Sequence, residues 1–164
     1  MKHTSLEKPQ GFTLVELLIV MGIALIILGM ITFNLAGTQR STSINASVNK
    51  IVADINSQRI KSMSGTTVSP SASDSFGVSF QSNKYVLFHG TAFNSGDSSN
   101  YSVNLDNSVL VSSTFPGNVV VFSQASGEVA NFASSSNTIT INNTGGTEQK
   151  VLTINWLGVI TNIQ

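Results

Sequence analysis

The fold is decided by the stretch Phe12-Thr-Leu-Val-Glu-Leu-Leu-Ile-Val-Met-Gly-Ile-Ala-Leu-Ile-Ile-Leu-Gly-Met-Ile-Thr-Phe33. It contains no proline, and its only formal charge is Glu16. A helix of roughly 22 residues, at ~1.5 Å per residue, reaches roughly 33 Å, which is enough to cross the hydrocarbon core of a bilayer. We therefore predict a transmembrane helix from Phe12 to Phe33.

Glu16 is the unusual residue of this stretch. A carboxylate at membrane depth costs roughly 2.5–3.5 kcal/mol on insertion scales, so an ionisable residue there indicates a function and a partner. A plain single-pass anchor explains the length of the run but not this charge. A secretory signal peptide needs a shorter apolar core, of about 7–15 residues, followed by a small-x-small cleavage site. The nearest candidate, Asn34-Leu35-Ala36, lacks the first small residue.

The flanking charges predict the orientation. Residues 1–11 are short and polar and contain Lys2 and Lys8. Because Lys and Arg near membrane spans favour the cytoplasmic side, we place this segment in the cytoplasm and everything after about residue 35 outside it.

A second helical pattern follows the apolar run. Apolar residues recur every three or four positions over residues 34–64, with polar residues between them: Ile44, Val48, Ile51, Val52, Ile55 and Met63. This pattern predicts an amphipathic continuation with one apolar stripe. We expect one long helix from about Phe12 to about Met63, with a weak point near Asn34–Gly37. Two helices joined at Gly37 are the alternative.

Over residues 65–164 the helical pattern gives way to the alternating pattern of β-strands. After a loop at residues 65–74, short alternating runs are separated by turn residues. The predicted strands are Phe76–Phe80, Lys84–His89, Tyr101–Leu105, Val109–Ser112, Val119–Phe122, Glu128–Phe132, Thr138–Asn142, Gln149–Trp156 and Val159–Ile163. Strands that follow one helix predict an α+β fold, with antiparallel sheets packed on the second half of the helix.

The predicted β domain has no evident catalytic centre. The chain has no Cys, so thiol chemistry and thiolate metal sites are excluded. His89 is the only His after the leader, and no triad or phosphate-binding loop is present. We expect no enzyme activity and no cofactor. An oxygen-rich stretch with Asp97, Asn100 and Asp106 is a weak Ca²⁺ candidate, without the spacing of an EF-hand.

Nucleic-acid binding is also not expected. After residue 65 the only basic residues besides His89 are Lys84 and Lys150, against five acidic residues. Binding to phosphates needs clustered Lys or Arg. The cations of the second helical segment, Arg40, Lys50, Arg59 and Lys61, are expected to face solvent or other subunits.

The segment Lys8-Pro-Gln-Gly11-Phe12-Thr13-Leu14-Val15-Glu16 resembles a type IV prepilin. The resemblance implies that residues 1–11 are a leader and that a prepilin peptidase cuts between Gly11 and Phe12. It also implies N-methylation of the new amine on Phe12 and assembly into a filament by an inner-membrane platform. In that assembly Glu16 would pair with the amine of a neighbouring subunit. Such a pair sets the register of subunits more than it adds stability.

The β-rich part resembles the GspH/FimT-like minor pilins and pseudopilins. The features are Gly77-Val-Ser-Phe80 before Tyr85-Val-Leu-Phe88, then Val120–Gly127, then the closing Val151–Ile160. The resemblance implies a structural subunit of a type II secretion system or a type IV pilus, anchored in the bacterial inner membrane with its C-terminal domain in the periplasm. A membrane-anchored binding or adhesive domain, or a DNA-uptake pilin of a competence system, is the alternative.

Overall fold

The computed structural model describes residues 11–65, 75–145 and 148–164, and for residues 31–41 it describes the backbone alone. Residues 1–10 of the predicted leader and the predicted loop after Gly65 lie outside the described residues. The chain divides into two compact units, Met1–Gln39 and Arg40–Gln164.

The first element is a single helix, α1, which runs from Leu14 to Met63 and contains 50 residues. It continues through Asn34–Gly37, so the prediction of one helix is confirmed and the alternative of two is wrong. The helix ends close to Gly65, whose φ of 63° is the left-handed conformation that glycine commonly adopts after a helix. Lys61 lies in the last turn, where a cation complements the helix dipole.

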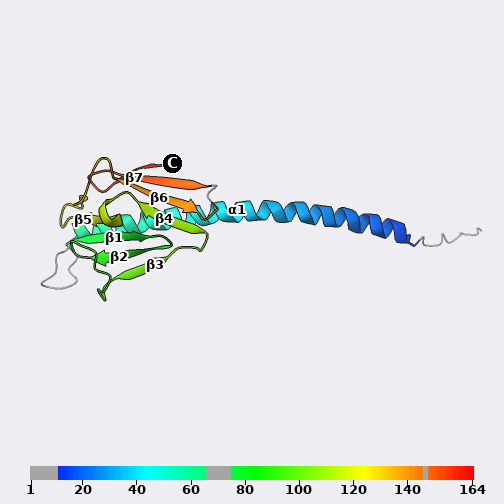
Figure 1. Ribbon diagram of the computed structural model, residues 1–164, viewed down its shortest axis with the longest axis horizontal. Coiled ribbons are helices and arrows are strands. Elements are labelled where there is room, and N and C mark those ends of the chain that lie inside the picture. The colour runs from blue at the N-terminus through cyan, green and yellow to red at the C-terminus, as the bar shows by residue number, and fades with distance from the viewer. Residues whose placement is uncertain (1–10, 66–74, 146–147) are drawn as a thin grey trace, which may run out of the picture. The chain divides into compact units, whose positions relative to one another are not determined.

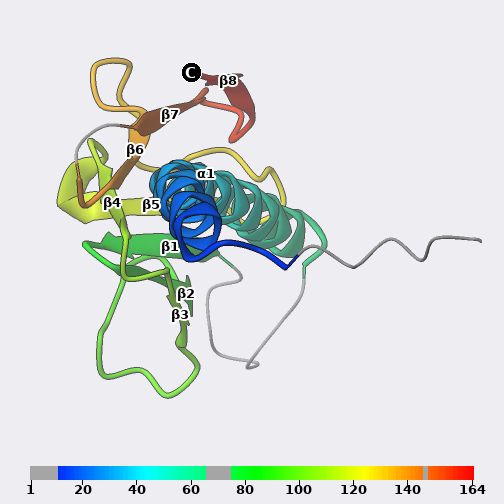
Figure 2. The same ribbon diagram turned by 90° about the vertical axis from the view of Figure 1, so that its right-hand side faces the viewer.

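Two antiparallel sheets of four strands follow (Figures 1 and 2). The first has the order β3-β2-β1-β5, with β1 at Phe76–Gln81, β2 at Lys84–His89, β3 at Tyr101–Asn104 and β5 at Val119–Phe122. The second has the order β4-β6-β7-β8, with β4 at Val109–Ser113, β6 at Thr138–Asn143, β7 at Gln149–Ile154 and β8 at Ile160–Ile163. A short 3₁₀ turn, η1 at Pro116–Asn118, precedes β5. The predicted α+β class is confirmed.

The core of the unit Arg40–Gln164 forms between the second half of α1 and both sheets. Ile44, Val48, Ile51 and Ile55 are buried and belong to one cluster with side chains of the two sheets. The sheet residues of this cluster are Val78, Phe80, Tyr85, Val103, Val109, Val111, Phe115, Val120, Phe122, Val129, Ile139, Ile141, Leu152 and Ile154. The predicted apolar stripe is therefore the face that packs on the sheets.

One predicted strand is wrong. Over Glu128–Phe132 the structure has a single isolated bridge, between Val129 and Phe122, within a turn region. The backbone N–H of Ala130 donates to Val121 as part of this bridge, whereas the N–H of Val129 donates to Trp156. The apolar residues here pack against the core, but no ladder forms because the Asn131 side chain replaces the backbone as partner of β5: it accepts from the Val121 N–H and donates to the Val119 carbonyl.

Candidate functional site

The start of α1 is built by a local hydrogen-bond motif. Thr13 directly precedes the helix, and its Oγ1 accepts a hydrogen bond from the backbone N–H of Glu16 at 3.2 Å. The carbonyl of Thr13 accepts from Leu17 at 3.2 Å. Thr13 is therefore the N-cap residue and Glu16 occupies the third helical position, which is the Thr-x-x-Glu pattern of a capping box. The sequence prediction missed this role, although the pattern was readable.

Gly11 and Phe12 lie before the helix in irregular backbone, and both are exposed. The Phe12 side chain is 82% accessible. A Cβ added to Gly11 would have no neighbour within 4 Å. A peptide bond in this setting is accessible to an enzyme without unfolding of the helix that follows.

The Glu16 side chain is exposed on the first turn of α1. Within residues 11–65, 75–145 and 148–164, its carboxylate makes no hydrogen bond or ion pair. A negative charge at this position is favoured by the helix dipole, whose positive end lies here. The cap fixes the backbone at Glu16, and the helix dipole favours the negative charge of its side chain.

The helix beyond Glu16 exposes apolar side chains on every face. From Leu14 to Met30, the large apolar residues are all at least half accessible: Leu14, Val15, Leu17, Leu18, Ile19, Val20, Met21, Ile23, Leu25, Ile26, Ile27, Leu28 and Met30. Soluble monomers rarely expose a continuous apolar surface of this extent, and such surfaces mark sites of contact with protein or membrane.

No helical segment among the described residues is both long enough and apolar enough to cross a membrane. The span predicted from Phe12 to Phe33 stays a prediction.

The weak Ca²⁺ candidates stabilise their own loops. Asp97 Oδ1 accepts hydrogen bonds from the backbone and the hydroxyl of Ser99, each at 2.8 Å. Asp106 Oδ1 accepts likewise from Ser108, and the Asn100 side chain donates to the carbonyl of Asn94. These serine hydrogen bonds lower the pKa values of both Asp residues. Among the described residues, no group of three or more His, Cys, Asp or Glu side chains could hold a metal ion.

Two cations of the second half of α1, Arg59 and Lys61, lie in different surroundings. Arg59 Nε donates to the carbonyl of Leu157 at 2.9 Å, so this cation holds the turn between β7 and β8. Lys61 lies instead in a pocket between α1 and the first sheet. The expectation that this chain does not bind nucleic acid stays a prediction.

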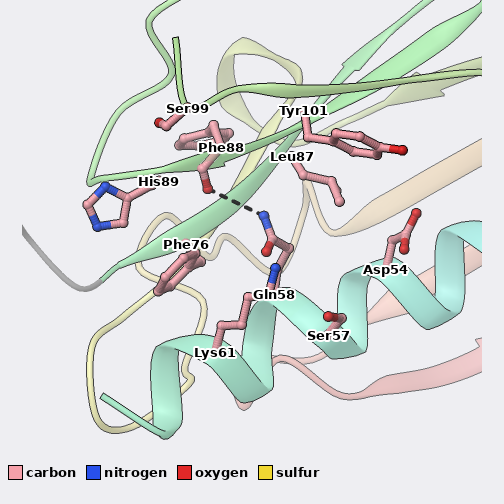
Figure 3. A pocket seen from close by; sticks show the side chains of 10 residues that line it. All are labelled: Asp54, Ser57, Gln58, Lys61, Phe76, Leu87, Phe88, His89, Ser99 and Tyr101. Atoms are coloured by element: carbon pink, nitrogen blue, oxygen red, sulfur yellow. Dashed lines mark hydrogen bonds between the residues drawn. The ribbon is translucent and has the colours of Figure 1, made fainter. Parts of the chain in front are cut away.

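That pocket was not predicted. It has a volume of about 350 Å³ and is lined by one face of α1, the outer ends of β1 and β2, and the segment leading into β3 (Figure 3). Its lining residues are Asp54, Ser57, Gln58, Lys61, Phe76, Leu87, Phe88, His89, Ser99 and Tyr101. No local sequence signal could have identified it, because its residues come from four segments that only the fold brings together.

Comparison with known proteins gives one match. Residues 8–32 match the model of the prokaryotic N-terminal methylation motif. No curated protein and no solved structure matches the chain. The chain thus carries a type IV prepilin-like signal, and the prediction of a pilin-like protein is confirmed at that level. The resemblance of the β domain to the GspH/FimT-like group stays a prediction.

Proposed function

We propose that this protein is a structural subunit, a minor pilin or pseudopilin, of a type IV filament machine that serves type II secretion or pilus biogenesis. The main support is the coincidence of three features in one segment. These are the methylation motif over residues 8–32, the exposed Gly11–Phe12 bond, and a capped helix with an exposed apolar surface.

Processing would convert the start of α1 into a paired site. Hydrolysis of the Gly11–Phe12 bond frees an α-amino group on Phe12, which is a cation at neutral pH. N-methylation leaves this nitrogen basic. In an apolar surrounding, that amine and the Glu16 carboxylate are each costly alone and compensate one another when paired. A pair between neighbouring subunits would then fix how far one helix is shifted along another.

The same helix would serve in two places. Before assembly, lipid would cover the apolar side chains between Leu14 and Met30, and the domain from Arg40 onward would lie in the periplasm. In the filament, helices of neighbouring subunits would cover them instead. Both settings suit a helix that is apolar on all faces.

Mass spectrometry of the N-terminus of the protein purified from its bacterium tests the processing step. The mature chain should begin at Phe12 and carry one additional methyl group. A Gly11→Val variant should keep residues 1–11, because a branched side chain at the cut obstructs the peptidase. Ala36→Val is the matched control and should be processed normally. A mature chain that begins at Met1 or at Gly37 would contradict the proposal.

A further inference from the structure

The two described sheets end in four edge strands, β3 and β5 in the first sheet and β4 and β8 in the second. The outward backbone N–H and C=O groups of an edge strand have no ladder partner, so an uncovered edge is a template for another strand. An edge that the chain itself does not cover is therefore a place where a second chain can pair.

The chain covers the outer edge of β5. The carbonyl of Val119 accepts from the Asn131 side-chain amide at 2.6 Å, and the N–H of Val121 donates to Asn131 Oδ1 at 3.3 Å. The carbonyl of Val121 accepts from the N–H of Ala130 at 2.8 Å. The segment after β5 thus occupies the groups that a further strand would need.

The outer edge of β4 is also covered, by residues that precede it in the chain. The N–H of Val111 donates at 2.8 Å to the carbonyl of Ser82, which lies in the turn between β1 and β2. The N–H of Val109 donates to the carbonyl of Asp106 at 2.9 Å. A strand from another chain would have to displace these contacts.

The outer edge of β3 is open. Leu105 donates to the carbonyl of Asn83, so in this register the backbone groups of Ser102 and Asn104 point away from β2. Within the part of the chain that the structure describes, no other residue bonds to these outward groups, and both residues are exposed. β3 contains no charged residue and no proline, two devices that commonly protect an edge.

The outer edge of β8 is open as well. Val151 and Gln164 exchange both backbone hydrogen bonds, at 3.0 and 3.1 Å, so Ile163 points its N–H and C=O away from β7. These two groups have no partner among the described residues, and the Ile163 side chain is 50% exposed. β8 also lacks charge and proline. The register shift of this pair lies between Thr153 and Ile154, opposite the start of β8, so the end at Ile163 is the pairable part.

The two open edges lie on opposite sides of the unit Arg40–Gln164. Figure 2 shows β3 below the second half of α1 and β8 above it. Pairing of β3 with β3 of a second copy would leave every β8 edge open. A contact between β8 of one copy and β3 of the next uses both edges, and a head-to-tail contact of this kind can continue as an open helical chain.

We propose that β8 of one copy adds as a strand to the β3 edge of the next copy, so that backbone hydrogen bonds join the sheets of neighbouring domains. Both edges are uncharged, so neither repels the other, and each carries the donors and acceptors that the other needs. This inference rests on the proposed function. In a filament whose helices hold the subunits together, the contact would connect their domains.

Cross-linking of two cysteine variants tests the pairing, since the parent chain has no Cys. Ser102→Cys and Ile163→Cys are purified as full chains in detergent, mixed, and treated with a short bismaleimide. Paired strands lie ~4.8 Å apart and each residue of register adds ~3.3 Å, so the linker tolerates a small shift. The mixture should give at least ~10-fold more dimer than either variant alone, because only a head-to-tail contact brings these two positions together.

A chain that carries both cysteines should give a ladder of oligomers, because each copy then links to two neighbours. Asn104→Pro in the Ser102→Cys chain should lower the mixed dimer at least ~10-fold, because it removes an outward N–H that β2 does not use. Asn104→Ala is the matched control: it keeps this N–H, so the yield should stay within about twofold. Both variants should keep the circular dichroism spectrum of the parent.

A mixed dimer no more abundant than the dimers of the single variants would overturn the proposal. A double variant that stops at the dimer, or equal yields from Asn104→Pro and Asn104→Ala, would overturn it too. Glu16→Gln should leave the cross-link unchanged, because both edges lie in the unit Arg40–Gln164. An absent cross-link in a chain that is processed and assembled would therefore refute this inference alone, and a cross-link in a chain that begins at Met1 would contradict the proposed function alone.

Discussion

The two halves of α1 share one backbone but differ in how their apolar side chains are covered. Between Leu14 and Met30 these side chains are exposed on all faces. In the second half, Ile44, Ile51 and Ile55 are fully buried against the sheets, while Asn45 and Asn49 face solvent. A stripe with a period of 3.6 residues needs cover on one side, and this chain provides it. The first half has no polar face, and no described residue of the chain covers its apolar side chains.

The two halves of α1 should differ most at Glu16, the charged residue of the first half. Glu16→Gln should reduce filament assembly at least roughly 100-fold, because loss of one partner of a buried ion pair costs about 3–5 kcal/mol. Gln keeps the backbone N–H that donates to Thr13 Oγ1, so the helix start is preserved. Assembly is measured as the amount of subunit in sheared filaments or as crosslinked neighbours in cells that produce the complete machine.

Thr13→Ala is the matched control for that variant. It removes the Oγ1 that accepts from Glu16 and costs about 1 kcal/mol of helix stability, but it keeps the charge. Assembly should therefore fall much less than in Glu16→Gln. If Glu16→Gln assembled normally, the charge of Glu16 would not be needed for assembly, and an anchored binding domain would become the better interpretation.

The same substitution should lower the stability much more in the second half of α1 than in the first. Ile51→Ala removes a fully buried side chain of the core and should lower the free energy of unfolding by about 2–5 kcal/mol. Ile23→Ala changes a side chain that is 53% exposed and should stay within about 0.5 kcal/mol. Denaturant titration of the full chain in detergent, followed by the fluorescence of Trp156, measures both. Equal losses would show that the first half is also covered by its own chain.

The sequence predicted most elements because their signals are local. Alternation and turn residues located eight strands, and the stripe from Ile44 to Ile55 identified the helix face that packs on the sheets. The error at Glu128–Phe132 shows where this reasoning fails. Alternation indicates which side chains are buried, but a strand also needs a neighbour whose backbone groups are free to pair, and here the Asn131 side chain occupies those of Val119 and Val121.

The candidate sites show the same difference between local signals and those that depend on the whole fold. Gly11, Phe12 and Glu16 lie within six consecutive residues, so a short motif was enough to identify them. The pocket around Gln58 depends on an amide held by carbonyls of Gly77 and Phe88, which lie 19 and 30 residues away. Only the register of β1 and β2 places those carbonyls together, and no pattern within the helix encodes it.

The turn at Gly158 packs against Arg59 near the end of α1, and it is too close to neighbouring backbone to accept a methyl group. Gly158 has a φ of 76°, and an added Cβ would lie 2.7 Å from the carbonyl oxygen of Gly127. Gly158→Ala should therefore cost about 2–4 kcal/mol, as the left-handed strain and the clash with backbone add. Gly117→Ala is the control, because Gly117 has a φ of 67° but open space around it, and should cost about 1–2 kcal/mol. Equal losses in the denaturant titration would show that the turn moves freely.

The smallest effect concerns how Tyr85 joins β2 to Asp54 of the helix. Burial, and next Asp54, raise the pKa of Tyr85, so the folded chain holds the phenolic proton more tightly than the unfolded chain, in which a tyrosine titrates near ~10. The resulting stability is complete below about pH 10 and falls as the pH rises further, by up to about 1.4 kcal/mol per pH unit. Denaturant midpoints from about pH 8 to about pH 11 should show this decline in the parent and in Tyr101→Phe. In Tyr85→Phe the decline should be shallower by that amount, since the titrating group is gone. A decline of equal slope in both variants would mean that the hydrogen bond between Tyr85 and Asp54 adds no stability.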